Sequence, residues 1–251
     1  MNGSPPSTID DRAGPTTPRT IPRTLVVWII TGVNIAVWLA MEASGGSTST
    51  RVLIAFGAKV NQLIVQGEYW RLLTAVFIHI GIMHLAFNSI ALLSFGRLAE
   101  LIYGHWRFLA IYLISGIAGA TFSALFNPRG LSAGASGAIF GIAGALAVFF
   151  AINRNKGPLV GQGQLGPIVA VLVLNGVFGV INPAIDNWAH AGGLISGAAV
   201  AVALTPRFQP VAGVEGVQVG WRLHRSSPTS WTVVAGVVAI IALLVLRIPG
   251  R

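Results

Sequence analysis

Seven long apolar runs dominate this sequence, at about 25–42, 84–103, 107–126, 134–152, 165–182, 187–204 and 231–248. Each is close to the ~20 residues that an α-helix needs to cross the hydrocarbon core of a bilayer. Only 9% of the 251 residues are charged, whereas soluble domains carry about 25%. So few charges cannot cover a water-facing surface, and the sequence therefore predicts an all-α polytopic membrane protein.

The remaining segments divide the chain into four parts. Residues 1–24 are rich in Pro, Ser and Thr and predict a disordered tail. Six of the apolar runs fall within 25–204, a Pro-containing linker is expected over 205–230, and 231–251 holds the seventh helix and its end. A cleaved signal peptide is the alternative for the first run. Its length, with Asn34 and Trp38 inside it, favours an uncleaved anchor.

Lys and Arg predict the orientation, because cytoplasmic loops of membrane proteins carry an excess of them. With seven spans, ten of these residues fall on the side of the N-terminus and six on the opposite side. We expect the tail 1–24 and the linker 205–230 to be cytoplasmic, in a bacterial plasma membrane. The net charge of +9 then reflects these loops. It does not indicate a nucleic-acid partner, because no basic cluster is interleaved with aromatic residues.

Polar side chains stand at the amino-terminal ends of the second, fourth and sixth runs, which would all enter from the exterior face. They are His84 and Asn88, then Ser136, then His190. A polar residue in a membrane segment is costly and usually functional. A serine and a histidine at matching depths are the minimum parts for nucleophilic catalysis. Taken alone, a serine such as Ser136 in a glycine-rich membrane helix would more often serve helix–helix packing.

These residues suggest separate roles. His84 and Asn88 are four apart, so on a helix they share a face and can both donate to an oxyanion, together with the backbone N–H of Ser136. Gly134 and Gly137 allow a tight turn and close approach of substrate. Asp186 is a weaker candidate for orienting His190, and otherwise the pair acts as a Ser–His dyad.

Glycine spacing predicts how the two catalytic runs pack. Small residues recur along the fourth and sixth runs, at Gly137, Gly141 and Gly144 and at Gly193 and Gly197. Such spacing lets two helix backbones come close in a membrane. We expect the helices to cross there and to bring Ser136 near His190. The connection 43–83, with its aromatic residues, is expected to form a partly inserted interfacial loop.

At these residues the chain resembles the rhomboid family of intramembrane serine proteases. The matching positions are Trp70-Arg71, His79, His84, Asn88, Gly134-Ala135-Ser136-Gly137, and Ala189-His190-Ala191-Gly192-Gly193 with Gly197. The resemblance covers about 25–204 and implies a six-helix core with one added C-terminal helix. It implies Ser136 as nucleophile, His190 as general base, and His84, Asn88 and the Ser136 N–H as the oxyanion site. Many members have a tyrosine where this chain has Phe140, which keeps the ring packing on the histidine.

Several alternatives belong to other classes. A non-catalytic rhomboid-like protein would bind transmembrane segments, but such relatives typically lack the serine or the histidine. A transporter predicts internal symmetry, and no clear repeat is visible. A zinc site of His79, His84 and His190 lacks a carboxylate and the helical HExxH spacing. We therefore expect no metal or cofactor, and we expect the substrates to be transmembrane proteins in the lipid bilayer. His79 is expected to have a structural role. Trp188 is expected either to shape the substrate cavity or to anchor the helix at the membrane interface.

Overall fold

The computed structural model describes residues 24–154, 156, 166, 168–170, 172, 173, 179, 181, 182, 185–212, 218–224 and 229–249, with the backbone alone at 210–212 and 218–224. Its elements are α1 (Leu25–Ala43), α2 (Thr50–Phe56), α3 (Asn61–Val65), α4 (Arg71–Thr74), η1 (Ala75–Phe77), α5 (Gly81–Ala91), η2 (Leu92–Gly96), α6 (Arg97–Tyr103), α7 (His105–Phe126), α8 (Ser136–Ile152), α10 (Asn187–Leu204), β1 (Arg207–Ala212), β2 (Gln218–His224) and α11 (Ser230–Val245). Half of the fifth predicted run and nearly all of the predicted tail lie outside the described residues.

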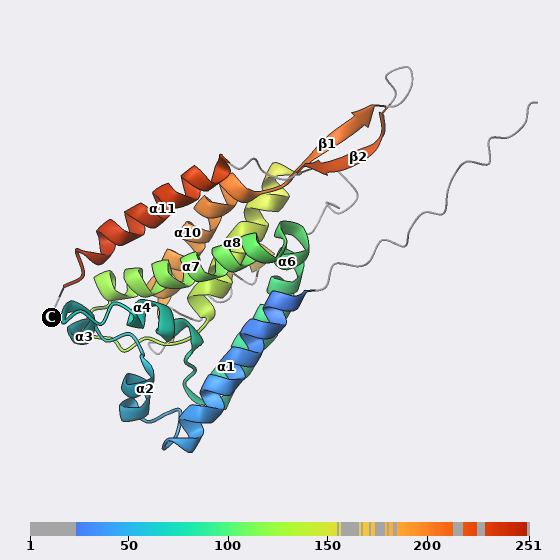
Figure 1. The fold of residues 1–251 in the computed structure, drawn as a ribbon. Coiled ribbons are helices and arrows are strands. Elements are labelled where there is room, and N and C mark those ends of the chain that lie inside the picture. The colour runs from blue at the N-terminus through green and yellow to red at the C-terminus, as the bar shows by residue number, and fades with distance from the viewer. Residues whose placement is uncertain are drawn as a thin grey trace, which may run out of the picture.

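Four of the described helices are long and apolar enough to cross a membrane, and the molecule is mostly helical (Figure 1). They are Leu25–Ala43, Gly81–Tyr103, His105–Phe126 and Asn187–Leu204. Two further apolar helices, α8 and α11, are shorter. These six helices coincide with six of the seven predicted runs. The chain is therefore an integral membrane protein with a helical bundle.

The second spanning helix is continuous but not uniform, because α5 passes into α6 through the π-helical turn η2. Near its end, the buried Glu100 accepts hydrogen bonds from the backbone N–H groups of Val26 and Val27 at 2.8 and 2.9 Å, and it also contacts His105. The first N–H groups of a helix have no partner within it. Glu100 therefore satisfies the start of α1 and joins the first two spans.

Helix α8 lies at the centre of the bundle and packs against both α7 and α10. Large side chains fill the end of this core away from Ser136, including Tyr103, Phe108, Leu146 and Phe149, which are fully buried. The Tyr103 hydroxyl donates to the Ala145 carbonyl oxygen at 2.7 Å. At the other end of α8, which carries Ser136, the contacts are instead between glycine and alanine backbones, so the helices are closest there.

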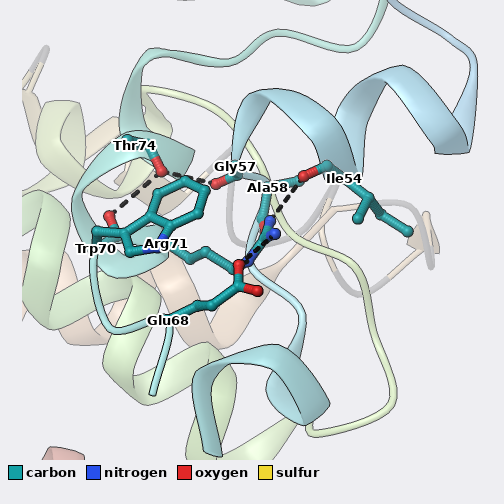
Figure 2. Close-up of polar contacts among 7 residues, drawn as sticks. All are labelled: Ile54, Gly57, Ala58, Glu68, Trp70, Arg71 and Thr74. Atoms are coloured by element: carbon teal, nitrogen blue, oxygen red, sulfur yellow. Dashed lines mark hydrogen bonds and ion pairs between the residues drawn. The ribbon is translucent and has the colours of Figure 1, made fainter. Parts of the chain in front are cut away.

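The connection between α1 and α5 folds into α2, α3, α4 and η1 beside the bundle. Its centre is Arg71, whose guanidinium donates to the carbonyl oxygens of Ile54 and Ala58 and pairs with Glu68 (Figure 2). The same guanidinium lies 4.6 Å from the centroid of the Trp70 ring. This network gives the connection between α1 and α5 a fixed shape without a long helix.

The predicted linker contains an element that the sequence did not indicate. Strands β1 and β2 pair antiparallel from Arg207 opposite His224 to Ala212 opposite Gln218, and the hairpin projects from the bundle (Figure 1). Asn153, at the end of α8, holds its base by donating to the Pro206 carbonyl and accepting from the Phe208 N–H.

Helix α11 returns along the bundle and contacts α10 and α7. Its end reaches the connection between α1 and α5 (Figure 1), where Val245 and Ile248 pack against a buried cluster of Ile64, Leu72, Ala120 and Ala124. The buried Asn61 amide donates to the carbonyl oxygens of Ala124 and Pro249, at 2.7 and 3.1 Å. Helix α11 is thus attached to the rest of the bundle at its far end.

Candidate active site

Ser136 is the first residue of α8 and is half-buried. The turn before it depends on Gly134, whose φ of +134° is disfavoured for any residue with a side chain. The Gly134 N–H donates to the Ala75 carbonyl oxygen at 2.8 Å, which ties this turn to η1. The first backbone N–H groups of α8 have no intrahelical partner and remain available beside the serine hydroxyl.

The start of α10 meets the start of α8 through bare backbone. A Cβ atom built on Gly193 would lie only 1.9 Å from the Gly137 carbonyl oxygen, and one on Gly197 would lie 2.3 Å from that of Gly141. Neither position has room for a larger residue. The crossing predicted from the glycine spacing is confirmed, and it brings the turn of α10 that bears His190 against the turn of α8 that bears Ser136.

Phe140 fixes the orientation of the histidine. Its ring stacks on the His190 imidazole with centroids 4.1 Å apart and planes 7° from parallel. Phe140 lies one helical turn after Ser136, so both point from the same face of α8. The imidazole is therefore held over the face that carries the serine, although the described contacts include no hydrogen bond between Ser136 and His190. Such bonds are often long in a free enzyme.

Asp186 does not orient the His190 ring. One of its carboxylate oxygens accepts from the Ala189 N–H at 3.1 Å and caps α10, and the other accepts from the Ser123 hydroxyl. The buried His190 Nδ1 has no hydrogen-bond partner within the described part of the chain. Among the described contacts, the His190 imidazole meets an aromatic ring and not a carboxylate.

His84 lies against the turn that leads to Ser136. A Cβ atom on Gly134 would be 2.7 Å from His84 Cε1 and 2.8 Å from Nε2. His84 Nδ1 accepts the Ile80 N–H at 3.3 Å, which assigns the proton of the neutral ring to Nε2. The edge of the ring nearest Gly134 therefore carries a hydrogen-bond donor.

Asn88 follows His84 by one turn of α5 and is buried. Its amide nitrogen donates to the His84 carbonyl oxygen at 2.9 Å, which uses one of the two hydrogens of that amide. The two side chains thus share a face, as their spacing predicts. The hydrogen bonds of the described residues include none between Asn88 and Ser136.

Two flanking residues occupy different positions. His79 is fully buried, its Nδ1 lies 3.3 Å from the Phe77 carbonyl oxygen, and its ring meets that of His84 edge to face at 5.3 Å. Burial, reinforced by His84, lowers the pKa of His79 to about 3, so the ring is neutral. Trp188 is about half exposed and stacks on Phe126, at 4.7 Å between centroids.

A small cavity opens beside Ser136, with the two glycines that flank the serine in its wall. Its lining is backbone and small side chains, including those of Ala75, Ser132, Ala133 and Ala189. Among the described residues no three His, Cys, Asp or Glu side chains are grouped as metal ligands.

Sequence reasoning missed Lys59 and Ser132, whose backbones pair and join the connection between α1 and α5 to the wall of this cavity. The only signal was that a lysine stands in an otherwise apolar stretch.

The residues of this site lie in the part of the chain that matches known proteins. Residues 66–207 match the family model described as a Rhomboid domain. The chain is 48% identical over 177 residues to the rhomboid protease GluP of Bacillus subtilis, a match that covers 70% of this chain and 34% of GluP. It is 35% identical over 208 residues to the rhomboid protease AarA of Providencia stuartii, covering 72% of this chain and 74% of AarA. RHOMBOID-like protein 6, mitochondrial, of Arabidopsis thaliana is 38% identical over 186 residues, covering 73% of this chain and 56% of that protein. The chain thus spans only about a third of GluP.

Proposed function

Because this chain belongs to the rhomboid family, we propose that it is an intramembrane serine endopeptidase that cleaves transmembrane segments of other membrane proteins. The observation that carries the proposal is the stack of Phe140 on His190, on the face of α8 that begins with Ser136. A serine, a neutral imidazole and free helix N–H groups at one level of a bundle are suited to acyl transfer.

The proposed reaction has two halves. His190 takes the proton of the Ser136 hydroxyl as its oxygen attacks the peptide carbonyl carbon, and it then gives that proton to the leaving amine as the C–N bond breaks. Water then attacks the acyl carbon as His190 takes its proton, and the bond to the Ser136 oxygen breaks as His190 returns that proton to the serine. The Ser136 N–H, His84 Nε2–H and Asn88 amide would stabilise the oxyanion in each half, because charge develops there in a site of low dielectric.

Two features bear on the substrate. An intact helix satisfies its own carbonyl groups, so the cleaved segment must unwind before Ser136 reaches it. The cavity beside the turn of Ser136 is lined by alanine, glycine and serine with one valine, Val76, which favours a small side chain at the scissile bond. A non-catalytic rhomboid-like protein that binds transmembrane segments is the competing function. The presence of both Ser136 and His190 favours the enzyme.

Purified protein in detergent tests the proposal directly. The wild type should cleave a model single-span substrate and react with a fluorophosphonate probe at Ser136. Ser136→Ala and His190→Ala should each abolish cleavage while remaining folded. Ser94→Ala is the matched control, because Ser94 only bonds the Ile90 carbonyl within its own helix and should retain full activity. Full proteolysis by either site variant, or an unlabelled wild type, would favour the alternatives.

The proposal includes a topology, which rests on the bias of ten Lys and Arg against six. The N-terminus and 205–230 would be cytoplasmic, and the end of α11 exterior, in a bacterial plasma membrane. A reporter fused after Arg251 should read as exterior, and one within 205–230 as cytoplasmic. Two cytoplasmic readings would mean that α11 does not span.

A further inference from the structure

Lys59 is an unusual residue in this fold because its side chain is fully buried just before α3. Its Nζ donates to the carbonyl oxygens of Asn127 and Gly130, each at 2.8 Å. Both carbonyls belong to the connection between α7 and α8 that leads to Ser136. A buried ammonium group is costly unless it is hydrogen-bonded or paired, so these contacts account for its presence.

The backbone of Lys59 holds the same connection. Its N–H donates to the Ser132 carbonyl oxygen at 2.9 Å, and the Ser132 N–H donates back to the Lys59 carbonyl oxygen at 3.2 Å. Two residues further on, Gly134 is bonded to Ala75. The connection between α1 and α5 therefore holds residues 127–134 by side-chain and backbone hydrogen bonds, as far as the turn before Ser136.

Charge connects Lys59 to the other catalytic helix. Burial lowers the pKa of Lys59 to about 8, and the Asp186 carboxylate acts in the opposite direction. Asp186 caps α10 at Ala189, directly before His190. Arg129, the one charged side chain on the α7–α8 connection, is exposed. Lys59 is thus bonded to the chain that leads to Ser136 and attracted to the carboxylate that begins the helix of His190.

We propose that Lys59 is a positioning residue, whose buried ammonium group fixes the 127–134 connection, and with it Ser136, relative to the helix that carries His190. The inference rests on the proposed function. It assigns no chemical step to Lys59, which touches neither candidate catalytic side chain.

Lys59→Met removes the donor and keeps the length of the side chain. We expect kcat for a single-span substrate to fall about tenfold with KM within twofold, and fluorophosphonate labelling of Ser136 to slow by a similar factor. Lys156→Met is the matched control, because Lys156 is the only other lysine and is exposed. A folded Lys59→Met protein with kcat within twofold of the wild type, or with only KM changed, would overturn the proposal.

A pH profile separates positioning from bulk stability. As pH rises through about 8, Lys59 loses its charge, and charge-assisted hydrogen bonds weaken. Wild-type kcat should therefore decline severalfold above that pH. Lys59→Arg stays charged throughout and should remove the decline, also if Lys59→Met does not fold. An unchanged decline in Lys59→Arg would contradict the proposal, and so would failure of both variants to fold, since that assigns Lys59 to the fold as a whole.

Hydrogen exchange provides a readout that does not depend on catalysis. In the Ser136→Ala background, the amides of Ser132 and Gly134 should exchange at least tenfold faster when Lys59→Met is added, and Lys156→Met should leave them protected. Equal protection in both would refute the role of Lys59. If the wild type cleaves nothing but this difference appears, the proposed function fails and the positioning contact stands.

Discussion

The ring of Phe140 lies parallel to the imidazole of His190, with 4.1 Å between their centroids. This contact, and not a carboxylate, limits how the histidine can turn, because Asp186 is bonded to Ala189 and Ser123. The orientation of the proposed base therefore depends on packing. An apolar contact of this kind holds the ring without adding a charge to the membrane interior.

Replacing the stacked ring should lower activity without removing it. Aromatic pairs contribute about 0.5–1.5 kcal/mol, so Phe140→Ala should reduce kcat by roughly 3–10-fold. Phe140→Tyr keeps the ring and should stay near the wild type, and Phe140→Leu, which keeps most of the volume, should behave like Phe140→Ala. Cleavage of a single-span substrate by folded protein measures each. A fully active Phe140→Leu would show that volume alone orients His190.

Asn88→Ala tests the oxyanion site. Loss of one donor in such a site typically costs about 10²–10³ in turnover, and here two other donors share the charge. We expect kcat to fall by up to about 10², less than in Ser136→Ala, with KM little changed. Steady-state cleavage kinetics give both constants. An effect confined to KM would place Asn88 in substrate binding.

Substituting the contact glycines should destabilise the bundle selectively. Gly193→Ala and Gly197→Ala force a methyl group into the α8 backbone, and overpacking costs about 1–3 kcal/mol or more. Gly32→Ala and Gly236→Ala are matched controls, because no atom beyond the adjacent backbone of their own helix lies within 4 Å of a Cβ at either position. Alanine there should be neutral or stabilising by up to about 1 kcal/mol. Thermal unfolding in detergent compares them, and equal effects at all four sites would refute the close crossing.

Acid should weaken the fold partly through His79. Its folded pKa of about 3 lies below the ordinary 6.5, so between these values the unfolded chain binds a proton that the folded chain does not. Its contribution is therefore complete above pH 6.5 and is lost as pH falls toward 3. The difference in melting temperature between the wild type and His79→Asn should narrow from pH 7 to pH 4. A constant difference would mean that His79 is not buried as a neutral ring.

Truncation separates α11 from the core. Removing residues 207–251 takes away the contacts of α11 with α7 and α10 and the Pro249 carbonyl bonded to Asn61. We expect the shortened protein to insert and to react with a fluorophosphonate at Ser136, with a melting temperature several degrees lower. Deleting only 246–251 should cause a smaller decrease. An inserted, protease-resistant truncation that is not labelled would show that α11 supports the site.

Local patterns predicted the site better than its surroundings. Glycines spaced four apart predicted that α8 and α10 touch, because each helix carries the small residues that close packing requires. Asp186 was considered for His190 because it is near in sequence, but it is the residue before α10, where an aspartate caps the helix. Lys59 could not be assigned, because its partners lie some seventy residues away and are backbone carbonyls. The sequence did not predict the hairpin, because Pro210 argues against a strand in the middle of a sheet. Proline is tolerated in edge strands, and both strands of a two-stranded hairpin are edge strands.

The bond between Asn61 and Pro249 joins residues 188 positions apart in the chain. A ribosome makes Asn61 long before Pro249, so this bond cannot form before α11 has been synthesised. Until then, the amide of Asn61 lacks its Pro249 partner, and the cluster that contains Ile64 and Leu72 lacks the packing of Val245 and Ile248. The loop that carries Trp70 and Arg71 therefore gains these contacts only after the helices bearing Ser136 and His190 have been synthesised.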